Sequence, residues 1–249
     1  MNDYRYDPLL TGIFVGIGAL VLWYFSSLAI EQKVISSNFD HIIRFFTILI
    51  ATLCGAFAAF RFNAKLEEGK ELRKQEALIN EKVAKLNKAL LNIAIQLNVI
   101  SNIVSVLNRY ENIHEHAFKM RAEKNFNEKV YVDINELSLI LTNEPMLLME
   151  LSVEQDGFIQ TIESLKTRNE HYINVLQPSM TELGLLDRKS NTIEYEQVLP
   201  YHVFKGAYDS VEVLIENVKE SEKGLEEKFN KLRVSCKNSF PNHKFMRLV

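Results

Sequence analysis

The residues best suited to chemistry lie close together between positions 109 and 114. This stretch reads Arg-Tyr-Glu-Asn-Ile-His, so a guanidinium, a carboxylate and an imidazole fall within about two helical turns. Glu111 and His114 have the Glu-x-x-His spacing that supplies one half of a carboxylate-bridged di-metal site in a helical bundle. Such a site needs a second Glu-x-x-His, and the sequence has no second copy. We therefore predict no metal site.

Arg109 and His114 also resemble the Arg-x-x-x-x-His signature of the HEPN ribonucleases, which are all-helical. The resemblance implies that the two residues act on an RNA phosphodiester at a dimer cleft. The chain differs in having Tyr110 after the arginine, where a polar residue is common in that family. The alternative, which we favour, is a pair of polar residues at the end of a helix, because this spacing also arises by chance. A membrane-tethered ribonuclease is thus the third of three functional hypotheses.

Other signatures of catalysis or cofactor binding are missing from the sequence. It contains no Gly-rich phosphate loop, no Gly-x-Ser-x-Gly elbow and no Cys-x-x-Cys pair. The net charge of -3 over 249 residues gives no case for direct nucleic-acid binding. The sequence therefore favours a protein that is not an enzyme and that uses no cofactor.

The chain begins with two apolar runs, residues 9–30 and 42–62, joined by a short polar stretch. The first run has no charged residue, and each is about as long as the 20 residues that cross a hydrocarbon core. A signal peptide is the competing interpretation. We reject it because the first run is too long and the residues before it are not basic. We predict a transmembrane hairpin over residues 1–62.

Positive charge gives this hairpin a predicted orientation. Few basic residues lie near the connecting stretch, namely Lys33 and Arg44. More lie at the end of the second run and after it: Arg61, Lys65, Lys70, Arg73 and Lys74. Because Lys and Arg mark the cytoplasmic side, we expect both termini in the cytoplasm and the short loop outside.

Small residues recur at four-residue spacing in both apolar runs. They are Gly12 and Gly16 in the first run, and Ala51, Gly55 and Ala59 in the second. Such ridges let helix backbones approach closely in lipid. Two interpretations stay open. Either the two helices of one hairpin pack on each other, or one ridge serves a neighbouring subunit in a homo-oligomer.

After residue 62 the sequence is typical of long helices. Pro and Gly number only 5 and 9 in the whole chain, which favours helices over a sheet. We predict a long helix over 63–125, charged at first and then carrying a heptad seam, followed by a helical bundle over 126–249. The fold class is therefore all-α, with a cytosolic antiparallel bundle. The seam consists of Ile79, Val83, Leu86, Leu90, Ile93, Leu97, Ile100, Val104 and Leu107.

The long helix has no charged residue between Lys88 and Arg109. Its polar residues there are Asn92, Gln96, Asn98, Ser101, Asn102, Ser105 and Asn108. We favour a helix buried within a bundle, with its amides hydrogen-bonded to neighbours. The alternatives are an oligomer interface or a polar helix that lines or enters the membrane.

Local signals predict the later helices. Asp133 is a predicted N-cap, and Asn143, Glu144 and Pro145 are the predicted cap and first turn of the next helix, which buries a stripe that ends at Leu183. Pro178 should kink that helix and Gly184 should end it.

Near the C-terminus we expect an extended piece over residues 192–197, a last long helix after Pro200 and a loosely held tail from Asn238.

In size and layout the chain is similar to the two-span membrane effectors of bacterial antiviral systems, such as those linked to retrons or abortive infection. The resemblance implies an effector of the bacterial inner membrane that oligomerises and perturbs the lipid bilayer when it is released or triggered. A cytosolic protein or nucleoprotein partner would hold it in check. The second hypothesis is a membrane-anchored scaffold or receptor that binds a cytosolic partner.

Overall fold

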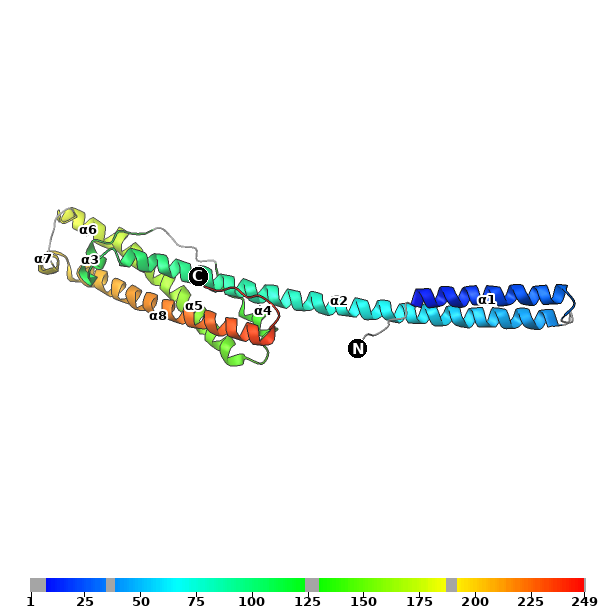
Figure 1. Cartoon of the computed structure of the whole chain (residues 1–249). Helices are drawn as coiled ribbons and strands as arrows, with labels where there is room; N and C mark the ends of the chain where they lie inside the picture. The colour runs from blue at the N-terminus through cyan, green and yellow to red at the C-terminus, as the bar shows by residue number, and fades with distance from the viewer. Residues whose placement is uncertain (1–7, 35–38, 124–129, 187–191, 249) are drawn as a thin grey trace. The chain divides into compact units, whose positions relative to one another are not determined.

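The computed structural model describes residues 8–34, 39–123, 130–186 and 192–248 (Figure 1). Every regular element in these ranges is a helix, which confirms the prediction of an all-helical chain. The chain divides into two compact units, Met1–Ile79 and Asn80–Val249, which we describe separately as unit 1 and unit 2. The predicted divisions at residues 62 and 125 stay predictions.

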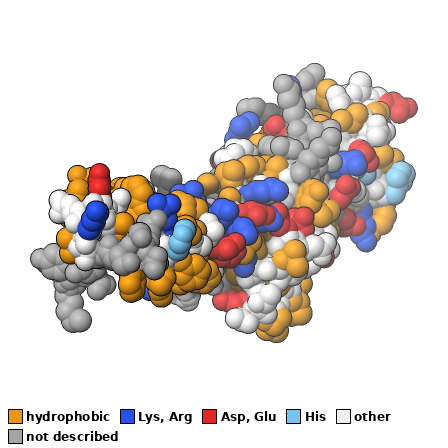
Figure 2. Space-filling model, turned by 90° about the vertical axis from the view of Figure 1, so that its right-hand side faces the viewer, with side chains coloured by type: hydrophobic (Ala, Val, Ile, Leu, Met, Phe, Trp, Pro, Cys, Tyr) orange, Lys and Arg blue, Asp and Glu red, His pale blue; other side chains and the backbone are white. Residues whose placement is uncertain are grey.

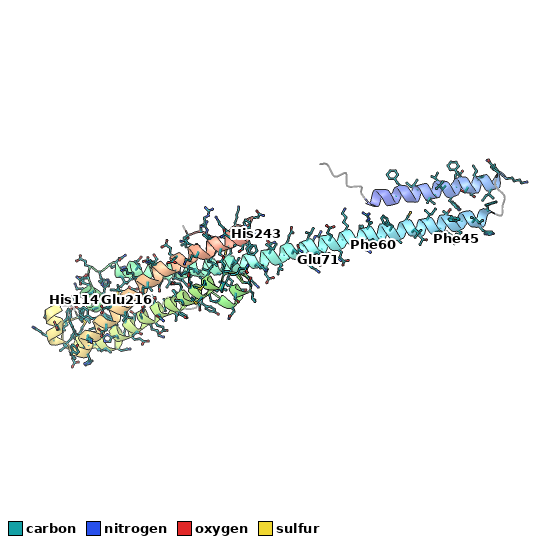
Figure 3. All side chains as sticks on the ribbon, turned by 90° about the horizontal axis from the view of Figure 1, so that it is seen from below. Phe45, Phe60, Glu71, His114, Glu216 and His243 are labelled. Carbon is teal, nitrogen blue, oxygen red and sulfur yellow. The ribbon has the colours of Figure 1, made fainter. Side chains whose placement is uncertain are left out.

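Unit 1 consists of α1 (Pro8–Glu31) and the first part of α2 (Asp40–Leu107). Large apolar side chains are exposed along both helices: Phe14 is 71%, Phe45 62% and Phe60 72% exposed. Phe45 and Phe60 extend from the surface of α2 in Figure 3. By length and composition, α1 and α2 each contain a stretch apolar enough to cross a membrane.

The helix α2 differs from its prediction at both ends. It begins at Asp40 and continues past residue 63, so the second apolar run and the charged segment belong to one helix. It ends at Leu107, although we predicted helix to about residue 125. The physical reason is Asn112, whose side chain accepts a hydrogen bond from the Glu115 backbone N–H and starts a new helix there.

The described residues of unit 2 contain the end of α2 and seven further helical segments. They are α3 (Ile113–Phe118), α4 (Ile134–Ser138), α5 (Pro145–His171), the π-helical turn η2 (Tyr172–Leu176), α6 (Gln177–Glu182), α7 (Thr192–Val198) and α8 (Tyr201–Ser239). Contacts such as Glu144 with Ser235 and Thr161 with Ser221 show that α5 and α8 run antiparallel (Figure 1).

Several local signals are confirmed. Asp133 caps α4 by accepting a hydrogen bond from the Glu136 N–H at 3.0 Å. The helix α5 begins at Pro145, with Glu144 rather than Asn143 at its N-cap position, and Gly184, with a φ of 66°, follows α6. The π-helical turn ends two residues before Pro178, whose ring crowds the preceding turn and whose missing N–H breaks the regular ladder.

Two groups of side chains form the core of unit 2. The larger group joins α2, α4, α5 and α8, and the smaller group joins α3, α6, α7 and α8. The predicted seam of α2 is buried over most of its length, and Leu86, Leu90, Ile93 and Ile100 are each 0% exposed. The stripe of α5 and α6 ends earlier than predicted, because Leu183 is 41% exposed.

Two predictions about the C-terminal part are wrong. Residues 192–198 form α7, because Tyr195 and Leu199 bury themselves in the smaller core at helical spacing. The C-terminal tail is docked rather than loose: Phe245 is only 7% exposed and packs in the larger core. Asn87 holds the tail by donating to the Lys244 carbonyl at 3.3 Å and accepting from the Met246 N–H at 3.2 Å.

Candidate functional site

Arg109 and His114 lie in different environments. Arg109 is exposed in the turn after α2, where its backbone N–H donates to the Val106 carbonyl at 3.1 Å. His114 is half-buried on α3, and its Nδ1 lies 3.1 Å from the Tyr208 hydroxyl. Figure 3 labels His114 at the end of unit 2, beside α8.

Aromatic rings surround His114. Its ring centroid lies 5.1 Å from that of Phe118 and 5.3 Å from that of Tyr195. Phe118 in turn stacks on Tyr195 at 4.6 Å. Edge and face contacts of this kind stabilise a core. The geometry supports a packing role for His114 within the smaller core.

Glu111 contributes its backbone rather than its carboxylate to this region. Its N–H donates to Glu115 Oε2 at 3.0 Å, and Lys119 Nζ donates to the other oxygen at 2.6 Å. These two donors lower the pKa of Glu115 below its ordinary value, with the Glu111 N–H contributing most. In the described part of the chain, no three His, Cys, Asp or Glu side chains gather closely enough to hold a metal ion.

The uncharged stretch of α2 contains two kinds of amide. Gln96 is fully buried, donates to the Val130 carbonyl at 2.7 Å and exchanges hydrogen bonds with Gln155 of α5 at 2.7 and 3.0 Å. Asn92 donates to the Tyr131 carbonyl at 2.8 Å. These two side chains donate hydrogen bonds to backbone carbonyls of a segment that lies beside α2. Polar groups on a buried bundle helix need such partners.

Three other predicted amides of the same stretch point outward. Asn98, Asn102 and Asn108 are exposed, as are Ser101 and Ser105 between them. The prediction of a helix buried on most sides therefore holds for only one face of α2. The opposite face is open, polar and uncharged.

The ridge residues of unit 1 are also exposed. Gly12, Gly16, Ala51, Gly55 and Ala59 all lie on the surface of their helices. A methyl group added at Gly12, Gly16 or Gly55 would meet no atom of the described residues within 4 Å, apart from near neighbours in the chain. The ridges thus leave room for a closely approaching helix.

A buried arginine, Arg168 of α5, was not predicted. It is 2% exposed and donates through both terminal nitrogens to the main-chain carbonyls of Arg121, His116 and Met120. Its guanidinium carbon lies 5.0 Å from the ring centre of Tyr172. Arg168 thereby anchors the segment after α3 to α5.

Burial lowers the pKa of Arg168 to about 10, so the side chain is still charged at neutral pH. Three carbonyl dipoles and an aromatic face balance that charge. A basic residue at a helical core position is the only sequence signal for this arrangement.

Small residues bring α5 and α8 close together, which was also not predicted. A Cβ built on Gly206 would lie 2.6 Å from His171 Nε2, and Glu154 crowds Gly224 in the same way. At the centre of the contact, Thr161 Oγ1 lies 2.7 Å from Ser221 Oγ. Glycines in the middle of a long, otherwise strong helix were the signal in the sequence.

Charged side chains cover the outer faces of α5 and α8. Glu150 accepts from Lys231 at 2.9 Å and lies 3.1 Å from Lys228, and both contacts lower the pKa of Glu150. Figure 2 shows acidic and basic side chains interleaved in this way on the charged part of the surface. Such mixed surfaces are typical of helices that face water.

Comparisons of the chain with protein-family models, with curated proteins and with solved structures found no match.

Proposed function

We propose that this protein is an inner-membrane effector that crosses the bilayer twice and acts by assembly rather than by catalysis. The observation that carries the proposal is the exposure of large apolar side chains along α1 and the first part of α2. Water would make such a surface costly, at about 25 cal/mol for each Å² of apolar area. Lipid removes that cost.

The short connection between the two apolar helices supports a hairpin topology. The helix α1 ends at Glu31, and α2 begins at Asp40. Hydrogen bonds from the backbone N–H groups of Lys33 and Val34 close the end of α1, and Lys33 has a φ of 58°. The cluster of basic residues after the second span supports cytoplasmic termini and a cytoplasmic unit 2.

The effector activity is supported by the small-residue ridges. Helices associate in lipid through close packing, and Gly16 and Gly55 leave space for another backbone. When a trigger releases unit 2, hairpins of several copies would cluster through these ridges and perturb the bilayer.

The test is inducible expression of the full chain in bacteria with a potential-sensitive dye. The proposal predicts loss of membrane potential after induction, and a large reduction of that loss for Gly16→Leu. Gly18→Leu is the matched control, because position 18 is rotated by about 200° from position 16 at 100° per residue. An intact potential at high membrane levels of the wild-type chain contradicts the effector proposal.

A membrane-anchored scaffold is the second candidate. It is favoured by exposed apolar residues at three- and four-residue steps on α5: Met146 is 63%, Met149 55% and Val153 62% exposed. Such a ridge is typical of a surface that receives another helix. Harmless expression, together with recovery of one stoichiometric cytosolic partner that Met149→Glu abolishes, would favour the scaffold over the effector.

A further inference from the structure

The helix α2 carries a second heptad stripe, which we call the outer stripe. It consists of Leu91, Ile95, Asn98, Asn102 and Ser105, with spacings that alternate between four and three. Leu91 is 44% exposed, Ile95 is half-buried, and the other three residues are exposed. The seam on the opposite side of the same helix is already packed in the core of unit 2. The helix α2 therefore has two heptad stripes: the seam, which packs in the core of unit 2, and the outer stripe, which is largely exposed.

The outer stripe differs from the other exposed helix faces by its lack of charge. Exposed positions on α5 carry Glu163 and Lys166, and those on α8 carry Glu227 and Lys231. Between Lys88 and Arg109, α2 has no charged side chain at all. When two identical helices meet in parallel and in register, each residue faces its own copy. A charged stripe would then repel itself, whereas an uncharged one does not.

The parallel arrangement rests on the proposed membrane location. The helix α2 continues without a break from its apolar first part to Leu107. If two copies cross one bilayer in the same orientation, their α2 helices therefore run in the same N-to-C direction, as a parallel contact requires. Asn102 lies at the same heptad position as Ile95, one heptad further on. An asparagine inside a two-stranded seam pairs with its copy and sets the register.

We propose that the outer stripe binds the outer stripe of a second copy of this chain, forming a parallel two-stranded contact. This contact adds a cytoplasmic interface to the close packing of the spans. Leu91 and Ile95 bury apolar area at its membrane-proximal end. The asparagines and Ser105 hydrogen-bond across the seam at its other end.

Site-directed crosslinking of the full chain in isolated membranes tests this contact. Single cysteines replace Asn98 or Ser105 in a Cys54→Ala background, and a short bismaleimide joins cysteines that lie close together. The remaining Cys236 is 0% exposed, and the background chain is expected to stay monomeric. Glu163→Cys on the exposed face of α5 is the control position.

We expect at least a fivefold higher yield of homodimer from Asn98→Cys and Ser105→Cys than from Glu163→Cys. Equal yields at all three positions, monomer throughout, or adducts with another protein in place of the homodimer would each overturn the proposal. A pair of exposed charges, Asn98→Glu with Asn102→Glu, should lower the yield at Ser105→Cys at least fivefold. Gln160→Glu with Thr167→Glu on α5 should leave it unchanged.

The crosslink and the membrane potential separate this inference from the proposed function. A crosslinked homodimer without loss of membrane potential would support the outer-stripe contact and contradict the effector proposal. Loss of membrane potential without a crosslinked homodimer would support the effector proposal and overturn the outer-stripe contact.

Discussion

The two parts of α2 place similar residues in opposite surroundings. In unit 1 the helix is lined by exposed apolar side chains, such as Leu53 at 61% and Phe57 at 61%. In unit 2 the same helix buries Leu90 and Ile93 completely against α5 and α8. The residue types hardly differ, but among the described residues only the second part of α2 has large apolar side chains that are fully buried.

The difference separates two ways of covering an apolar helix. In unit 2 other helices of the chain, chiefly α5 and α8, cover the apolar side chains of α2. In unit 1 the described residues leave these side chains exposed, and our proposal places lipid around them. Lipid fits best, because the exposed apolar surface surrounds the helix instead of forming a single stripe.

The largest expected effect separates the two parts of α2 directly. Leu90→Ala removes a fully buried side chain and should lower the free energy of unfolding of unit 2 by about 2–5 kcal/mol. Leu53→Ala, at an exposed position, should leave it unchanged. Denaturant titration of the detergent-extracted chain, followed by hydrogen exchange in unit 2, measures both. Equal losses would mean that both parts of α2 pack in protein.

The next effect concerns the buried cation of unit 2. Arg168→Met leaves three main-chain carbonyls without their donor and should cost about 3 kcal/mol. Arg109→Met, at an exposed position, is the control and should change stability by less than about 0.5 kcal/mol. The same unfolding measurement applies. A neutral Arg168→Met would show that the carbonyls find water instead.

The two faces of α2 within unit 2 give a smaller contrast. Gln96→Leu leaves the Val130 carbonyl and the Gln155 side-chain NH2 group without their partners and should cost about 1–3 kcal/mol. Asn98→Ala on the outer stripe should cost less than about 0.5 kcal/mol. If the order were reversed, the outer face rather than the inner one would be packed in the monomer.

The smallest effect is a dependence on pH. Burial, with smaller contributions from Arg168 and His202, lowers the pKa of His171 below its ordinary value of about 6.5. The unfolded chain therefore takes up a proton that the folded chain resists, and stability falls as the pH drops from about 7 to 5. His171→Gln should flatten this part of the melting-temperature profile, whereas His202→Gln, which removes only a smaller contribution to the lowered pKa of His171, should flatten it much less. Parallel profiles for the wild type and His171→Gln would exclude the effect.

Local signals allowed much of the helical layout to be predicted. Asp133, Pro145 and Gly184 act within their own turns, so their roles are readable from neighbouring residues. The apolar runs and the α2 seam were readable from length and period. Gln96 lies at helical spacing between the buried Ile93 and Ile100, but the sequence did not distinguish it from the exposed Asn98 and Asn102.

The missed features depend on partners far away in the sequence. Arg168 is buried where it contacts main-chain carbonyls in α3 and in the segment after it, and Phe245 is buried where Asn87 hydrogen-bonds to the C-terminal tail. The exposure of Asn98 depended on which helices cover α2. No spacing rule states which face of a long helix a bundle leaves open.

The central claim is that α1 and the first part of α2 reside in lipid. Alkaline carbonate extraction of membranes from cells that express the full chain tests it most directly. We predict that the chain stays in the membrane pellet after extraction and enters solution only with detergent. Recovery of the folded chain in the aqueous supernatant would contradict the account.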